Sequence, residues 1–178
     1  MIVMMAPIPF LKDNLVWTGL IAAIIFAITS LTDMLDGKIA RKYNLITDFG
    51  KFMDPLADKF MVFGAMLCII YRYEAIRPVF IWAAAIVMFR ELAVTSIRLV
   101  VSGKEGLVVA ASWLGKIKTV LQVVCIVTVL VEPALATFIP FCKYYVLSYV
   151  TMIAMLVMTL WSGIDYLKSY WKFIDPTK

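Results

Sequence analysis

Long apolar stretches alternate with short polar connectors along most of the chain. The apolar stretches cover residues 15–32, 60–71, 79–101, 113–131 and 142–161. Because a helix needs about 20 mostly apolar residues to cross a bilayer, four of these stretches predict membrane-spanning helices. The stretch over 60–71 reaches that length only if its helix begins near Pro55. Residues 1–10 are also apolar but too few to span alone, so they predict a first helix that is short or truncated.

Composition supports the membrane class. Hydrophobic residues make up 63% of the 178 residues and charged residues 16%, which is too apolar for an ordinary soluble domain. The start of the chain lacks the basic segment and the small-residue cleavage site of a secretory signal peptide. No internal repeat or long linker divides the sequence, so we expect residues 1–178 to form one integral membrane domain.

The cysteine positions and the absence of histidine limit the kinds of catalytic chemistry open to the chain. Cys68, Cys125 and Cys142 lie in or beside apolar stretches without a CxxC spacing, so they predict buried free thiols instead of disulfides or a metal site. The sequence contains no histidine, which removes imidazole as a base, nucleophile or metal ligand. Any chemistry must therefore use carboxylates, amines or hydroxyls.

Basic residues are distributed unequally between the two sides of the membrane. If the connectors alternate sides, four basic residues fall on one side and the other thirteen lie on or toward the second. The four are Lys12, Arg72, Arg77 and Lys143. The positive-inside rule makes the second side cytoplasmic. The net charge of +5 therefore indicates orientation and attraction to anionic membrane lipids, and we expect no nucleic-acid partner.

Aspartates gather where two predicted helices meet. Asp33 and Asp36 are three residues apart at the end of one apolar helix, and Asp54 and Asp58 are four apart at the start of the next. Each pair shares a helix face. A turn between the helices would bring the two pairs into one cluster, whereas Asp48 lies off both faces and is assigned a structural role.

A cluster of four carboxylates at a membrane edge needs counter-ions. Asn44 and Gly50 could help to form the turn that brings the carboxylates together. Unpaired, the four charges would be costly, and Mg²⁺ or Mn²⁺ ions are the natural partners of oxygen ligands. Two divalent cations would balance the four charges. The alternative is that these aspartates are solvated connector charges or form surface ion pairs with nearby lysines and arginines.

Eight residues of this region reproduce a known signature. The pattern is DxxDGxxAR, then a spacer of eight residues, then GxxxDxxxD. Its fixed positions are Asp33, Asp36, Gly37, Ala40, Arg41, Gly50, Asp54 and Asp58. The pattern resembles that of the CDP-alcohol phosphotransferase family. The resemblance implies an all-α, six-transmembrane-helix bundle with a cytoplasm-facing cavity, in a bacterial cytoplasmic membrane. It also implies a CDP-alcohol donor, an alcohol acceptor, two divalent cations and a homodimer.

The resemblance also implies roles for these residues. Asp33, Asp36 and Asp54 match metal ligands, and Asp58 matches a residue that approaches the second metal and serves as the catalytic base. A metal pair would neutralise the donor diphosphate, and Asp58 could accept the proton of the attacking hydroxyl.

Three further positions match contacts to the donor nucleotide, namely Gly37, Ala40 and Arg41. Gly37 and Ala40 lack bulk, which permits close approach, and Arg41 offers a planar fork to phosphate. The alternative for the two small residues is ordinary packing between membrane helices.

Arginines within the apolar stretch over 79–101 indicate an anionic ligand. Arg90 lies about eleven residues into the stretch and Arg98 follows two turns later on nearly the same face, which is costly unless something anionic faces them. Glu91 could pair with one of them. It cannot neutralise Arg90 and Arg98 together with Lys116 and Lys118, so a positive surplus remains for a phosphate-bearing acceptor.

Two segments limit the choice of acceptor alcohol. FRELAVTSIRL and LGKIKT resemble parts of bacterial family members that use CDP-diacylglycerol and glycerol 3-phosphate to make phosphatidylglycerophosphate. By that resemblance Arg90, Arg98 and Lys116 match the residues that bind the acceptor phosphate. The alternatives are a phosphatidylinositol-phosphate or cardiolipin-type synthase or, from another class, a cation or proton transporter with intramembrane carboxylates.

Overall fold

The computed structural model describes residues 14–43, 48–102 and 113–174. Within them lie five α-helices and one short 3-10 helix, and no strand. They are α3 (Leu15–Lys42), α4 (Asp48–Arg72), α5 (Arg77–Ser102), α6 (Trp113–Leu135), the 3-10 helix η1 (Pro140–Tyr144) and α7 (Val146–Ile174). The all-α prediction is confirmed. The apolar segment predicted as a short first helix lies outside the described residues, so the count of six helices stays a prediction.

Four of the described helices contain segments long and apolar enough to cross a membrane. These segments are Leu15–Asp33, Arg77–Arg98, Trp113–Leu135 and Val146–Trp171. The surfaces of the helices agree with a membrane location, because large apolar side chains point outward: Phe89 is 76% exposed and Trp82 is 71% exposed. Such a surface suits a lipid environment and would be a liability in water. The chain is therefore an integral membrane protein, as predicted.

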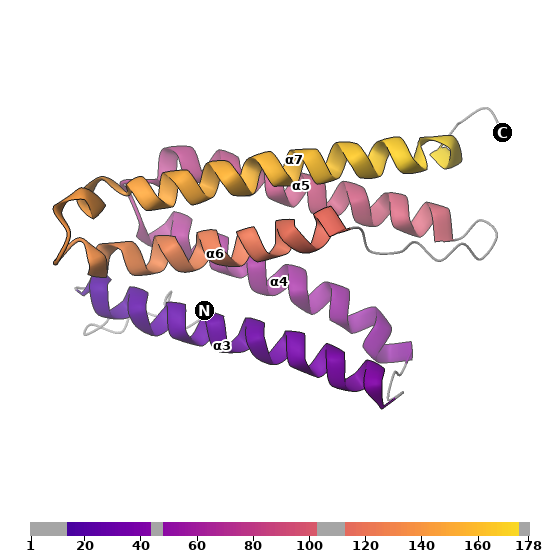
Figure 1. The fold of residues 1–178 in the computed structure, drawn as a ribbon, viewed down its shortest axis with the longest axis horizontal. Helices are drawn as coiled ribbons and strands as arrows, with labels where there is room; N and C mark the ends of the chain where they lie inside the picture. Colours follow the sequence, from indigo (N-terminus) through magenta and orange to yellow (C-terminus); the bar gives the residue numbers. More distant parts are fainter. Residues whose placement is uncertain (1–13, 44–47, 103–112, 175–178) are drawn as a thin grey trace.

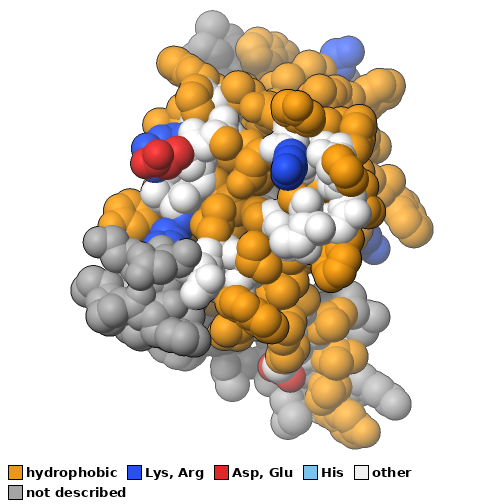
Figure 2. Space-filling model, turned by 90° about the vertical axis from the view of Figure 1, so that its left-hand side faces the viewer, with side chains coloured by type: hydrophobic (Ala, Val, Ile, Leu, Met, Phe, Trp, Pro, Cys, Tyr) orange, Lys and Arg blue, Asp and Glu red, His pale blue; other side chains and the backbone are white. Residues whose placement is uncertain are grey.

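The helices form an elongated antiparallel bundle (Figure 1). The C-terminal ends of α3, α5 and α7 lie at one end of the bundle with the first residues of α4 and α6, and η1 lies at the opposite end. The segments predicted to face the cytoplasm therefore lie together at the first of these two ends, which we call the basic end. On the opposite end, viewed in Figure 2, hydrophobic side chains prevail and charged ones are sparse.

Helix α6 holds the bundle together because it packs against α3, α4 and α7, while α5 packs against α4 and α7. The core between these helices is apolar, with Phe26, Phe80, Val129 and Met155 at most 2% exposed. Cys68, Cys125 and Cys142 are buried free thiols, which confirms their prediction.

Helix α4 begins earlier than the sequence suggested. The expected start was near Pro55, but the helix runs from Asp48. An acidic residue in a first helical turn is stabilised by the helix dipole, and membrane helices tolerate an internal proline because neighbouring groups compensate for the lost hydrogen bond. Gly50 consequently lies inside the helix, and the prediction that it helps to form the turn was wrong.

A buried carboxylate joins α6 to α7 at the end opposite the basic end. Glu132 is 0% exposed and accepts hydrogen bonds from the Leu147 amide at 2.9 Å, the Ser148 amide at 2.7 Å and the Ser148 hydroxyl. These amides belong to the first turn of α7, where backbone donors lack helical partners. Between the helices Tyr145 adopts a left-handed conformation, and burial, followed by the Glu132 charge, raises the pKa of its hydroxyl.

Candidate functional site

The two aspartate pairs lie at similar distances from the connector that joins α3 to α4. Asp36 precedes the end of α3 by six residues, and Asp54 follows the start of α4 by six. At 1.5 Å per residue, each lies about 9 Å along its helix from the connector. Asp33 and Asp58 lie about one turn deeper on their own helices. Since the C-terminal end of α3 and the first residues of α4 both lie at the basic end (Figure 1), the four positions lie at similar distances from that end.

Only part of the predicted metal cluster can be followed to its side chains. Asp33 and Asp36 are exposed on α3, where their carboxylates are accessible to a ligand. The side chains of Asp54 and Asp58 lie outside the described residues, as do those of Ala40 and Arg41, and Gly37 is placed only as part of α3. Among the residues that are described, no three potential ligands group together, so the metal site stays a prediction.

Arg90 is held between two helices near the middle of the bundle. Its side chain is 12% exposed. One terminal nitrogen, Nη1, lies 3.4 Å from Glu91 Oε1 on the same helix, and the other, Nη2, donates to Ser162 Oγ of α7 at 3.0 Å. Nε is buried and has no hydrogen-bond partner among the described residues. The guanidinium is thus fixed in orientation while one donor remains available.

Lys118 of α6 completes this arrangement. It is 4% exposed, and its ammonium group pairs with Glu91 Oε1, the same oxygen that faces Arg90. We call Arg90, Glu91, Lys118 and Ser162 the Arg90 cluster. Two cations share one carboxylate in it, which leaves a positive surplus in a region that is shielded from water.

A second contact ties the Arg90 cluster to α4. The Lys59 ammonium donates to the Thr95 hydroxyl, and that hydroxyl donates to the Glu91 carbonyl oxygen at 2.7 Å. Lys59 follows directly after Asp58 in the sequence. The cluster therefore joins α5, α6 and α7 and reaches the helix that carries the second aspartate pair.

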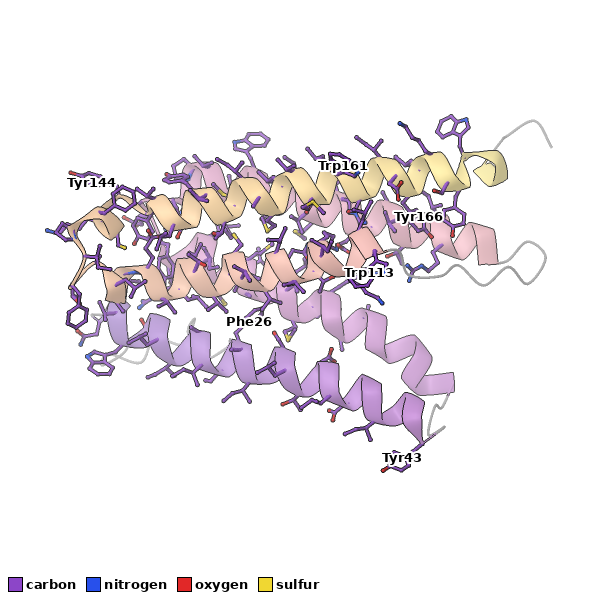
Figure 3. The ribbon with its side chains drawn as sticks, viewed as in Figure 1. Phe26, Tyr43, Trp113, Tyr144, Trp161 and Tyr166 are labelled. Atoms are coloured by element: carbon purple, nitrogen blue, oxygen red, sulfur yellow. The ribbon has the colours of Figure 1, made fainter. Side chains whose placement is uncertain are left out.

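Arg98 and Lys116 have more open positions than Arg90. Both are exposed, and the Lys116 ammonium lies 5.3 Å from the centroid of the Trp113 ring, within the range of a cation–π interaction. Trp113 lies at the basic end, as does Tyr166, while Tyr144 marks the opposite end (Figure 3). The structure thus brings Arg90 and Lys118 together and leaves Lys116 outside their cluster.

Lys118 belonged to the predicted positive surplus but not to the predicted site, and Ser162 and Thr95 were not predicted. A signal for Lys118 was present, because it lies two residues after Lys116 and so on another face of α6. Ser162 and Thr95 gave no signal, since a hydroxyl in an apolar helix most often bonds to its own backbone. Their roles depend on neighbours far away in the chain.

Several buried polar atoms near the Arg90 cluster lack partners within the described part of the chain. On α7 they are the hydroxyls of Thr159 and Tyr166, and on α6 the amide nitrogen of Gln122. Thr159 lies one turn from Ser162, and Gln122 lies one turn from Lys118. Buried polar groups are nearly always hydrogen-bonded, so this interior offers donors to water or to a polar ligand.

Comparison with known proteins gives one consistent family. The family model for CDP-alcohol phosphatidyltransferase matches residues 1–164. A Bacillus subtilis protein named CDP-diacylglycerol–glycerol-3-phosphate 3-phosphatidyltransferase is 43% identical over 137 residues, covering 74% of this chain and 68% of the relative. Relatives of the same name occur in Yersinia enterocolitica, at 36% identity over 90% of this chain and 85% of the relative, and in Shigella flexneri, at 33% identity over 86% and 80%.

Proposed function

The chain belongs to the CDP-alcohol phosphatidyltransferase family, and we propose that it transfers the phosphatidyl group of CDP-diacylglycerol to glycerol 3-phosphate, giving phosphatidylglycerophosphate and CMP. The names of its relatives support both substrates. The observation that supports a phosphorylated acceptor is the Arg90 cluster, where the buried Lys118 and the partly buried Arg90 share the single carboxylate of Glu91. The negative charge of a phosphate group would compensate the remaining positive charge, whereas an acceptor without phosphate would leave it uncompensated.

In this proposal Arg90 and Lys118 bind the acceptor phosphate from the interior of the bundle. Arg90 offers its Nε, which has no partner among the described residues, and a guanidinium forms strong charge-assisted hydrogen bonds with phosphate. The predicted binders Arg98 and Lys116 are exposed and would attract the anion as it approaches from the cytoplasm. Lys118 is an addition to the predicted set, supported by its burial and its contact with Glu91.

The aspartate pairs suit two divalent cations, either Mg²⁺ or Mn²⁺. The pairs lie at matched distances from the connector on α3 and α4 and supply only oxygen donors, which both ions prefer. Asp33, Asp36, Asp54 and Asp58 would hold the ions. When bound, the ions would neutralise the donor diphosphate and stabilise the CMP leaving group.

The side chains of the chain would perform the remaining steps. Asp58 takes the proton from the acceptor hydroxyl, and the hydroxyl oxygen forms a bond to the phosphorus that carries diacylglycerol. The bond from that phosphorus to the CMP oxygen breaks, and CMP leaves. Gly37 and Ala40 allow the nucleotide to approach the backbone closely, and Arg41 binds a donor phosphate.

The charge distribution supports a reaction at the cytoplasmic face of a bacterial inner membrane. The basic end of the bundle would face the cytoplasm by the positive-inside rule, where soluble glycerol 3-phosphate reaches it, while CDP-diacylglycerol enters from the surrounding lipid. We also propose a homodimer, as the family resemblance implies.

The direct test is CMP release by the purified protein in detergent with CDP-diacylglycerol and Mg²⁺, with and without glycerol 3-phosphate. We expect release only when both the metal and the acceptor are present, and none from the Asp58→Asn variant. Asp48→Asn is the matched control, because Asp48 belongs to neither aspartate pair, and it should retain activity. Release that does not depend on glycerol 3-phosphate would refute the proposed acceptor.

A further inference from the structure

We propose that Glu91 is a positioning residue, which holds Arg90 and Lys118 side by side so that both address one acceptor phosphate. The inference rests on the proposed function and concerns the same site. A single oxygen, Oε1, lies 3.4 Å from Arg90 Nη1 and also pairs with the Lys118 ammonium. One carboxylate oxygen therefore sets the distance between two cations that come from different helices.

The low exposure of Arg90, Lys118 and Glu91 makes the carboxylate bridge between the two cations necessary. The side chains of Arg90, Lys118 and Glu91 are 12%, 6% and 15% exposed, so water screens the two positive charges poorly. Like charges repel strongly under such conditions. Without the carboxylate, Arg90 and Lys118 would move apart, and a phosphate would have to bring them together again on binding.

Glu91 leaves one donor of Arg90 available to a phosphate. It occupies Nη1, and Ser162 Oγ accepts from Nη2 at 3.0 Å, so the guanidinium plane is fixed from two sides. Nε remains without a partner among the described residues. A simple structural ion pair needs one cation for each carboxylate, whereas here the carboxylate orients two cations and neutralises only one charge.

The backbone of Glu91 extends the bridge to α4, the helix that carries Asp58. Its carbonyl oxygen accepts from the Thr95 hydroxyl at 2.7 Å, and that hydroxyl accepts from Lys59 of α4. Because this contact uses the backbone of Glu91, a change of its side chain would keep the link to α4 and disturb the acceptor-binding groups on α5 and α6. The donor side, on α3 and the first turns of α4, would be affected much less.

The test is steady-state kinetics of Glu91→Gln, measured on the full chain in detergent for both substrates. Gln keeps the shape of the side chain but removes the charge. We expect the KM for glycerol 3-phosphate to rise about 10-fold or more, as for loss of a charge-assisted contact. The KM for CDP-diacylglycerol should stay unchanged, and kcat should change about threefold or less. Glu91→Asp, which keeps the charge on a shorter side chain, should raise the acceptor KM less than Glu91→Gln.

Glu74→Gln is the matched control. Glu74 is an exposed glutamate that pairs with Arg77 at 3.6 Å, away from the Arg90 cluster, and its replacement should change neither KM. An unchanged acceptor KM in Glu91→Gln, or an equal loss in both KM values and kcat, would overturn the proposal. If Glu91→Gln does not fold, an acceptor KM of Glu91→Asp equal to that of the wild type would also overturn it.

The failure of this inference is distinguishable from failure of the proposed function. If the wild type does not use glycerol 3-phosphate at all, the proposed function is wrong. If the wild type uses it and the Glu91 variants bind it equally well, only the role of Glu91 is wrong. A binding measurement without donor separates the two further: glycerol 3-phosphate should raise the Tm of the wild type and raise that of Glu91→Gln much less.

Discussion

Replacing Glu132 should destabilise the bundle more than replacing any exposed carboxylate. The side chain is fully buried and accepts three hydrogen bonds, from the Leu147 amide and from the amide and hydroxyl of Ser148. Glu132→Ala leaves all three donors without an acceptor, in a region that water reaches poorly. Each unsatisfied buried donor costs about 1–3 kcal/mol, and partial relaxation reduces the sum to about 3–5 kcal/mol.

The effect should be visible as a loss of thermal stability in detergent. For a chain of this size 1 kcal/mol corresponds to about 2–4 °C in Tm, so Glu132→Ala should lower Tm by about 6–20 °C. Glu132→Gln keeps one oxygen acceptor but turns an NH₂ group toward a backbone donor, so it should cost about 1–3 kcal/mol. Ser148→Ala removes only the hydroxyl contact and should cost about 1 kcal/mol.

Glu74→Ala removes an exposed carboxylate whose ion pair contributes little, and its Tm should match that of the wild type. The reasoning is wrong if Glu132→Ala melts within about 2 °C of the wild type, or if Glu132→Gln is the less stable of the two variants.

Two close contacts of glycines and the proposed metal ligands each give a further prediction. A Cβ at position 19 would lie 2.8 Å from the Tyr73 hydroxyl and collide with the Leu130 carbonyl oxygen, so Gly19→Ala should lower Tm by about 2 °C or more. A Cβ at position 163 would lie 3.3 Å from Arg90 Cγ, so Gly163→Ala should raise the KM for glycerol 3-phosphate by about threefold to tenfold; an unchanged KM would contradict this. Chelation with EDTA should abolish CMP release, and Mg²⁺ or Mn²⁺ should restore it; activity that survives exhaustive chelation would refute the metal assignment.

The fold class was predictable because its signal is local. Apolar stretches of membrane-spanning length are visible without any knowledge of contacts, and they led to the helices α3, α5, α6 and α7. The start of α4 was not predictable in this way. Gly50 and Pro55 are turn and helix-start signals in soluble proteins, but within a membrane bundle both lie inside a helix.

The polar contacts were less accessible to sequence reasoning, since they depend on residues distant in the chain. Glu132 directly follows the predicted apolar stretch over 113–131, where a charged residue is usually solvated, yet it is buried because Ser148, sixteen residues later, supplies donors. Glu91 was expected to be able to pair with one of the two arginines, and it contacts Arg90. The choice between Lys116 and Lys118 needed the rotation of α6, which places Lys118 inside the bundle and Lys116 on its surface.

The measurement that tests the central claim most directly is a competition between acceptors. The purified protein is given CDP-diacylglycerol and Mg²⁺ together with equal concentrations of glycerol 3-phosphate, inositol 1-phosphate, glycerol and phosphatidylglycerol, and the lipid products are identified by mass spectrometry. Our account predicts phosphatidylglycerophosphate as the dominant product, formed in equal amount to the CMP released. A dominant product from glycerol or phosphatidylglycerol would contradict the assignment of the Arg90 cluster to an acceptor phosphate, and one from inositol 1-phosphate would contradict the choice of glycerol 3-phosphate.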